Sequence, residues 1–124
     1  MLRATVGERT RYFELYCFEL YSLRIGGANM MISITTGKYT EEQARQSQMF
    51  LKDFLPRMKK FPGVVAIYHF AQPDKGAEST IVIWESPEAL KAYREGDLVK
   101  EAVAFEKKTG MPTSREAYPI LTAL

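Results

Sequence analysis

Two runs of β-branched and aromatic residues in the middle of the chain constrain the fold more than any other feature. They are VVAIYHF (64–70) and STIVIWE (79–85), and the stretch between them contains Pro-Asp and Gly, which supply turn geometry. This pattern predicts a β-hairpin. A strand with one face in water alternates apolar and polar residues, whereas these strands are apolar at almost every position. We therefore expect both faces of the hairpin to be covered.

A strand and a long helix are predicted before the hairpin. MISITTGKY (31–39) is rich in Ile and Thr, as strands are. TEEQ (40–43) has the form of a capping box, and apolar residues at helical spacing follow it up to a Phe-Pro-Gly stop. Because Pro56 has no amide hydrogen to donate, we expect a kink or a break near it.

Two shorter helices and a last strand are predicted after the hairpin. Ser86 is a suitable N-cap and Pro87 a suitable first helical residue. After a glycine, Asp97 is expected to cap a second helix, which Gly110 ends. SREAYPIL (114–121) is the predicted last strand.

The order strand, helix, strand, strand, helix pair, strand is that of the ferredoxin-like split βαβ arrangement, an α+β fold. It places the helices on one face of a four-stranded antiparallel sheet and leaves the other face bare. Since the hairpin strands are apolar on both sides, a second copy is the simplest cover. We therefore expect a homodimer that packs sheet against sheet.

Composition excludes several classes of partner and site. A net charge of +2 with 26% charged residues gives no dense basic stripe, and RMKK (57–60) is a short helix-end cluster, so no nucleic acid is expected. The lone cysteine, Cys17, allows no intrachain disulfide and suits a reducing cytoplasm. One His and one Cys cannot build the usual zinc site, so no metal is expected. No apolar run approaches the roughly 20 residues that span a bilayer, so no membrane is expected.

Residues 1–30 differ from the rest of the chain. Charges at Glu14 and Glu19 interrupt their apolar stretch, which argues against a secretion signal. Thr10 could cap a helix that ends at Gly26-Gly27. The alternative, which we favour, is an upstream extension or a mis-set start, with the domain proper spanning residues 31–124.

Beyond these patterns, the chain resembles the antibiotic biosynthesis monooxygenase (ABM) domain family of the dimeric α/β-barrel superfamily. The resemblance is carried by FPGVVAIYHF (61–70), STIVIWESPEALKAYREGD (79–97) and LVKEAVAFE (98–106), and it covers about residues 31–121. It implies the dimeric barrel fold. It also implies one of several activities: cofactor-independent oxygenation of quinol-like aromatics, haem degradation, or small-molecule isomerisation.

Three positions of this chain show whether the resemblance extends to the haem-degrading branch of the family. The haem-degrading branch relies on an Asn, a Trp and a His where this chain has Ile32, Tyr93 and Val103. Haem degradation is therefore not expected, and neither haem nor any other cofactor is.

His69 is the only histidine and the first candidate for a catalytic group. An imidazole titrates near neutral pH and can act as a general base. The alternative is a strand-end histidine that pairs with backbone or solvent. Tyr68 and His69 are adjacent on a strand, so they point to opposite faces, and the sequence leaves open which of them faces the helices.

Three more residues are candidates for substrate binding. Trp84 could stack on an aromatic substrate, although it more simply fills the junction between sheet and helices. Tyr93 lies where the related haem enzymes place a pocket residue, and Arg94 follows it. Together with Tyr68 they form the predicted binding set.

The function predicted from the sequence is a cofactor-independent monooxygenase acting on a small aromatic or quinol-like molecule. His69 would supply the base, and Trp84 and Tyr93 would supply shape and exclude water. Two alternatives stay open: a non-catalytic ligand-binding or stress-response dimer of the same fold, and a small-molecule isomerase. A cavity containing His69 favours an enzyme, and a filled core with His69 at the surface favours binding.

Overall fold

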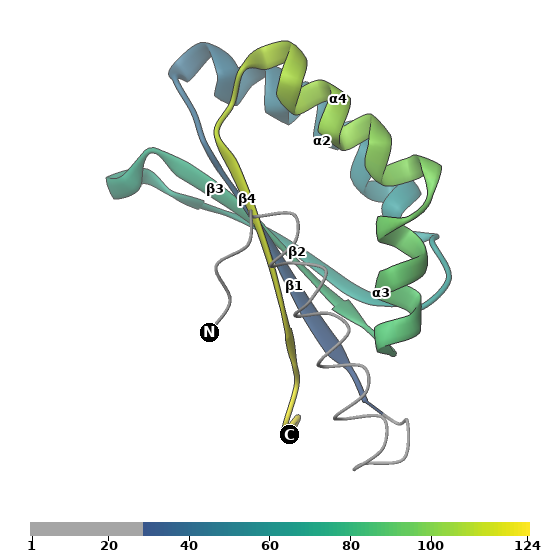
Figure 1. Ribbon diagram of the computed structural model, residues 1–124. Helices are drawn as coiled ribbons and strands as arrows, with labels where there is room; N and C mark the ends of the chain where they lie inside the picture. Colours follow the sequence, from purple (N-terminus) through teal and green to yellow (C-terminus); the bar gives the residue numbers. More distant parts are fainter. Residues whose placement is uncertain (1–28) are drawn as a thin grey trace, which may run out of the picture.

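A computed structural model describes residues 29–124 and shows a four-stranded antiparallel sheet with three α-helices (Figure 1). The strand order is β2-β3-β1-β4, which is the ferredoxin-like arrangement and confirms the predicted fold class. The predicted extension and its helix from Thr10 lie almost wholly outside the described residues. The elements are β1 (Met31–Lys38), α2 (Glu41–Lys59), β2 (Val64–Gln72), a 3₁₀ turn (Pro73–Lys75), β3 (Ala77–Trp84), α3 (Pro87–Arg94), α4 (Asp97–Thr109) and β4 (Thr113–Pro119).

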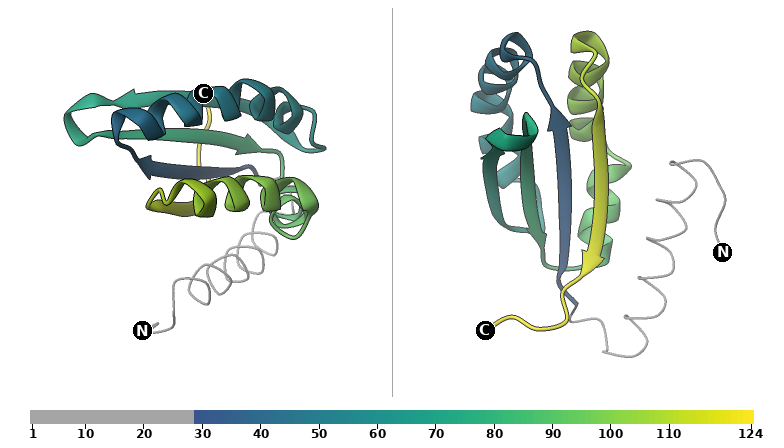
Figure 2. Two further views of the ribbon diagram at one scale, coloured as in Figure 1. Left: turned by 90° about the horizontal axis from the view of Figure 1, so that it is seen from above. Right: turned by 90° about the vertical axis from the view of Figure 1, so that its left-hand side faces the viewer.

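The helices and the sheet form two layers. In Figure 2, α2 and α4 run along the same face of the sheet, and in the right-hand view they lie behind it, with α2 behind β2 and β3 and α4 behind β4. No helix among residues 29–124 covers the opposite face. The predicted placement of the helices is therefore confirmed.

The start of α2 is fixed by the capping box predicted from TEEQ. The Gln43 amide donates to Thr40 Oγ1 over 3.2 Å, and the Thr40 amide donates to Gln43 Oε1 over 3.0 Å. Of the kink or break expected at Pro56, the break is wrong, because α2 continues through this residue to Lys59. Pro56 and Lys52 both lie on the exposed side of the helix, so water can reach the carbonyl that the proline leaves unpaired.

The helix pair begins as the sequence indicates, with one correction. Ser86 caps α3, since its Oγ accepts from the Ala89 amide over 3.1 Å, and Pro87 follows as the first residue. The N-cap of α4 is Gly96, not Asp97, and no side chain caps it. Asp97 is instead the first residue of α4, where its charge complements the helix dipole.

Gly63 fixes the approach of α3 to the turn before β2. Its φ of +93° lies in a region that L side chains rarely adopt, and an added Cβ would lie 2.3 Å from the Cβ of Ala89. Both the backbone conformation and the space therefore require glycine here. This constraint explains the Pro-Gly pair ahead of β2.

The core lies between the sheet and the helices, and Trp84 is its most buried large side chain, with no exposed surface. The indole Nε1 donates to Ser33 Oγ over 2.9 Å, so its one polar group is satisfied inside the core. The indole ring is also 5.2 Å from the ring of Tyr93, centroid to centroid. Trp84 thus packs against the ring of Tyr93 and helps to fix its position.

The other face of the sheet is apolar and, in a single chain, partly in water. Tyr68 is 61% exposed and Phe70 40% exposed, while Ile34 and Ile81 pair across the centre of this face and are half-buried. The hairpin therefore carries apolar side chains on both faces, as its sequence predicts. Its second face offers a surface on which another molecule could pack.

Candidate functional site

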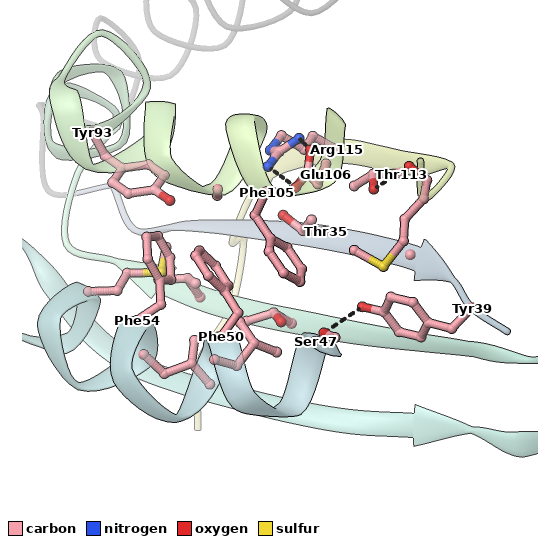
Figure 3. Close-up of a pocket in the computed structure, with 18 residues that line it drawn as sticks. Thr35, Tyr39, Ser47, Phe50, Phe54, Tyr93, Phe105, Glu106, Thr113 and Arg115 are labelled. Carbon is pink, nitrogen blue, oxygen red and sulfur yellow. Dashed lines mark hydrogen bonds and ion pairs between the residues drawn. The ribbon is translucent and has the colours of Figure 1, made fainter. Parts of the chain in front are cut away.

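A cavity of about 70 Å³ lies between the sheet and the facing sides of α2 and α4. Figure 3 shows that its walls come from four kinds of element: side chains of α2 below, of α3 and α4 above, of the strands behind, and of the β1–α2 loop at one end. Most of the wall is apolar. Its aromatic and polar side chains include Tyr39, Phe50, Thr80, Tyr93, Phe105 and Arg115.

Aromatic rings cross the middle of the cavity region. Phe50 of α2 and Phe105 of α4 stack with centroids 4.3 Å apart and planes 9° from parallel, and Phe50 also stacks on Phe54 at 5.0 Å. These rings give the site flat apolar surfaces of the kind that bind aromatic molecules. They also connect the two helices across the cavity.

Side chains join α2 to α4 at three levels along their length. The contacts run from the start of α2 to its end: Gln43 Nε2 donates to the Thr109 carbonyl over 2.8 Å, Phe50 stacks on Phe105, and Arg57 forms an ion pair with Glu101 at 2.7 Å. The width of the cavity is therefore set by side chains that reach from helix to helix.

An ion pair forms part of the polar wall. Arg115 of β4 donates to both carboxylate oxygens of Glu106 in α4, over 2.9 and 2.5 Å, and both side chains are mostly buried. Such a two-pronged pair has a fixed geometry. It places the positive guanidinium of Arg115 at the cavity wall, where the Glu106 carboxylate balances its charge.

A tyrosine and a serine close one end of the cavity. Ser47 Oγ of α2 donates to the hydroxyl oxygen of Tyr39 over 3.3 Å. Burial raises the pKa of Tyr39, and the hydrogen bond from Ser47 lowers it by a smaller amount. The charges of Glu78 and Glu106 raise the pKa further. Tyr39 is therefore a neutral phenol with a hydrogen to donate.

Tyr93 carries the most informative polar atom of the site. The residue is only 7% exposed, yet among residues 29–124 its hydroxyl has no hydrogen-bond partner, and Figure 3 shows it pointing into the cavity. Burial raises its pKa to about 12, which the nearby charge of Arg115 lowers and that of Glu106 raises. The hydroxyl oxygen is not itself fully enclosed, so a ligand or a water molecule in the cavity can accept its hydrogen.

The pKa of Tyr93 gives a test of its burial. A folded-state pKa above the ordinary value of 10.0 means that stability is intact below pH 10 and falls as the pH rises toward 12. Ultraviolet titration of the folded chain should show one phenol ionising near pH 12, and Tyr93→Phe should remove it. Tyr39→Phe is the comparison, because that variant should keep the late transition. Loss of the late transition in Tyr39→Phe alone would contradict the assignment.

The structure places the five predicted site residues in different environments. Tyr93 lines the cavity, whereas Trp84 lies in the core beneath it and Tyr68 points to the helix-free face. His69 is on the helix-covered face of β2 but does not line the cavity, and its side chain is 25% exposed. Arg94 is partly buried, and burial together with the charge of Arg115 lowers its pKa to about 10. Of the five, the structure therefore brings only Tyr93 to the cavity.

Several residues of the cavity were not predicted. Tyr39, Ser47, Glu106 and Arg115 come from a loop, two helices and a strand, and each is an ordinary residue in its own segment. One signal was available for Arg115. It is a charged residue in the last strand, spaced so that it shares the inward face with Ala117, where a charge requires a partner.

Comparison with known proteins gives the fold a family context. No protein-family model and no curated protein sequence matches the chain. Among solved structures, a putative antibiotic biosynthesis monooxygenase from Deinococcus radiodurans superposes with a TM-score of 0.69 at 17% identity, over 76% of this chain and 95% of that one. SnoaB, a cofactor-independent oxygenase from Streptomyces nogalater, gives 0.62 at 15% identity, over 78% and 98%.

A haem-degrading protein from Mycobacterium tuberculosis gives a TM-score of 0.60 at 12% identity, over 78% of this chain and 97% of that one. At these identities the similarities establish the fold alone, and they confirm that it is the ABM-type fold. The described part of the chain also has no helix long and apolar enough to cross a membrane.

Proposed function

We propose that this chain, which has the fold of antibiotic biosynthesis monooxygenase domains, is a cofactor-independent monooxygenase for a small aromatic or quinol-like molecule bound between the sheet and α2 and α4. The observation that carries the proposal is the Tyr93 hydroxyl, which is protonated, faces an aromatic-lined cavity and has no partner among residues 29–124. SnoaB, a cofactor-independent oxygenase, shares the fold.

The polar groups of the site suit a substrate with an acidic oxygen. The hydroxyls of Tyr39 and Tyr93 are both donors, and the Arg115 guanidinium adds positive charge. A donor that contacts the substrate oxygen favours a phenolate or enolate over the neutral form, because the hydrogen bond stabilises the negative charge. An electron-rich anion of this kind is what reacts with oxygen when no cofactor takes part.

The size of the cavity limits what can enter without movement. A cavity of roughly 150 Å³ holds one benzene ring, about twice the 70 Å³ present here. A substrate of one or more rings must therefore displace side chains, and the stacked rings of Phe50 and Phe105 are the ones that cross the space. Binding is expected to part this stack.

The proposed reaction balances without an added reductant. A base removes one proton from an activated methylene of the substrate, and the resulting carbanion adds oxygen to give a hydroperoxide at that carbon. Loss of water then leaves a ketone, so the sum is R–CH₂–R plus O₂ gives R–CO–R plus H₂O. The substrate supplies all four electrons. His69 is the proposed base, since it is the only histidine in the chain and an imidazole can act as a general base.

The proposed working unit is a homodimer in the cytoplasm, joined through the helix-free face of the sheet. The support is the set of apolar side chains on that face. Among them, Tyr68, Phe70 and Tyr118 are exposed to water in a single chain. Contiguous apolar patches of more than a few hundred Å² are rare on soluble monomers. A two-fold pairing would cover the same patch on both copies.

Oxygen uptake tests the proposed reaction. The whole chain should accelerate oxygen consumption by anthrone above the rate of autoxidation, in an oxygen-electrode assay. Tyr93→Phe should lower kcat/KM by about 10–100-fold, because a hydrogen bond to a charged group is worth about 1.5–3 kcal/mol. Ser79→Ala, on the opposite face of β3, should leave the rate unchanged. Equal rates for Tyr93→Phe and the wild type would remove Tyr93 from the mechanism.

A second candidate function is favoured by the position of His69. A ligand-binding dimer without catalysis needs an apolar pocket with a few donors and no base at its wall, and His69 does not line this cavity. Calorimetry separates the two candidates. Binding of the same phenols without any oxygen uptake would favour the binding protein.

A further inference from the structure

Three polar side chains on the hairpin form a line that begins at the cavity wall. The register of the sheet places His69 of β2 directly opposite Thr80 of β3, and Glu78 lies two residues before Thr80 on the same strand. Side chains two apart on a strand share a face, so all three belong to the face that carries the helices. Thr80 is one of the residues that line the cavity.

The distances make this line continuous. His69 Nδ1 is 2.9 Å from Thr80 Oγ1, and His69 Nε2 is 2.9 Å from Glu78 Oε1. A carboxylate only accepts hydrogen bonds, so Nε2 carries the ring hydrogen when the imidazole is neutral. Nδ1 is then the acceptor, and the Thr80 hydroxyl donates to it.

His69, in the middle of the line, is the more exposed side chain of the ion pair, and Glu78 at the far end is mostly buried. The His69 side chain is 25% exposed and that of Glu78 is 14% exposed. The charge of Glu78 is also among the causes that raise the pKa of Tyr39, a cavity residue. The line therefore connects the inside of the site to solvent.

We infer that Thr80, His69 and Glu78 form a proton relay, in which Thr80 receives a proton from the substrate and His69 accepts it through the Thr80 hydroxyl. The relay rests on the proposed function, because it supplies the base which that reaction needs. It also explains how His69 can act on a substrate although it does not line the cavity. His69 and Glu78 are positioning and relay groups, and Thr80 is the group that meets the substrate.

Each proton in the relay is accounted for. A lone pair of Thr80 Oγ1 takes the substrate proton as the original hydroxyl hydrogen moves to His69 Nδ1. Thr80 ends with the same number of hydrogens, and His69 becomes an imidazolium between the Thr80 oxygen and the Glu78 carboxylate. Opposite charge at Glu78 stabilises that imidazolium. The Nδ1 proton then returns through the Thr80 hydroxyl to the peroxide anion that oxygen addition produces, which gives the hydroperoxide and restores the starting state.

A purely structural role would look similar in the resting structure, since a polar cross-strand group stabilises a hairpin by about 0.2–1 kcal/mol. The relay makes two demands that such a role does not. It requires Thr80 to donate its hydrogen bond to His69 Nδ1, and it requires the Thr80 hydroxyl for removal of the substrate proton.

The direction of the hydrogen bond can be measured without any substrate. His69 is the only histidine in the chain, so ¹⁵N-histidine labelling gives one pair of ring nitrogens and no assignment problem. At a pH where the ring is neutral, we expect hydrogen on Nε2 and none on Nδ1. Thr80→Val should shift the Nδ1 resonance. Hydrogen on Nδ1 in the wild type would overturn the relay.

Proton removal can be measured without oxygen. In D₂O under nitrogen, the whole chain should accelerate hydrogen–deuterium exchange at the methylene of anthrone, or at the ring carbons of the smaller phloroglucinol. Thr80→Val and His69→Gln should each lower the catalysed exchange by about 10²-fold, which is within the usual range for an acid–base group. Thr80→Ser should restore most of it, because serine keeps the hydroxyl. Calorimetry should show unchanged binding of the probe by Thr80→Val.

The outcomes separate the relay from the function on which it rests. Exchange that proceeds equally well in Thr80→Val overturns the relay and leaves the oxygenase standing. Exchange that depends on Thr80 without oxygen uptake supports the relay and refutes the oxygenase. No exchange of either probe by the wild type refutes both. Circular dichroism shows whether Thr80→Val is folded, and Glu78→Gln, which should lower exchange as well, provides a second test.

Discussion

Trp84→Ala should lower the free energy of unfolding by about 3–5 kcal/mol, the range for truncating a large aromatic side chain in a core. Trp84 has no exposed surface, and its ring contacts those of Phe61 and Tyr93. Its removal leaves a cavity, because β3 and the capped helix α3 that flank this position cannot move in to fill it. It also leaves the hydroxyl of Ser33 without its donor. Since Trp84 is the only tryptophan, unfolding should be followed in urea by circular dichroism.

Ser33→Ala is the matched variant. It keeps the packing of the indole but leaves its buried N–H unpaired, so a loss of about 1–3 kcal/mol is expected. The urea midpoint should fall in both variants with an unchanged slope. A loss below about 1 kcal/mol for Trp84→Ala would mean that this side chain is not the centre of the core.

Ile81→Lys should convert a dimer into a monomer by raising the dimer Kd at least about 10³-fold. Ile81 lies opposite Ile34 at the middle of the helix-free face, and two-fold pairing would bury one new ammonium from each copy. An unpaired buried charge costs several kcal/mol, and every 1.4 kcal/mol is tenfold in Kd. Sedimentation velocity at micromolar concentration measures the change, for the whole chain and for residues 31–124, which we expect to dimerise alone.

Ala104→Lys is the control for added charge. Ala104 is exposed on α4, in the layer away from the proposed interface, so its lysine should leave the dimer intact. Ile81 is only half-buried in one chain, so Ile81→Lys should still fold. A wild-type chain that sediments as a monomer would contradict the sheet-to-sheet pairing.

The fold could be predicted from the sequence because its signals are local. The Thr40 capping box, the Ser86-Pro87 start and the Pro-Gly turn each act within a few residues, and each lies where it was expected. Pro56 was misjudged for a physical reason that periodicity does not show. A proline breaks a helix when it leaves a buried carbonyl unpaired, and here the affected carbonyl is on the solvent side.

The site was harder to predict because its parts meet only after folding. Arg115 and Glu106 come together across a strand and a helix, and nothing in either segment marks the pair. His69 is conspicuous as the one histidine, but its partners follow from the register of the hairpin. Two strands joined by a loop allow several registers, and only one sets His69 opposite Thr80. That register came from the structure.

The three side-chain links between α2 and α4 bear on how such a domain can diverge. They occur about once in every two turns of α2, at Gln43, Phe50 and Arg57, and the middle link fills the space above the sheet. The outer two can hold the helices at a fixed separation while the middle pair is exchanged. Over evolutionary time, a descendant chain can then acquire a larger or smaller ligand through one or two substitutions. Its backbone, its helix-free face and the hairpin that carries His69 need no adjustment.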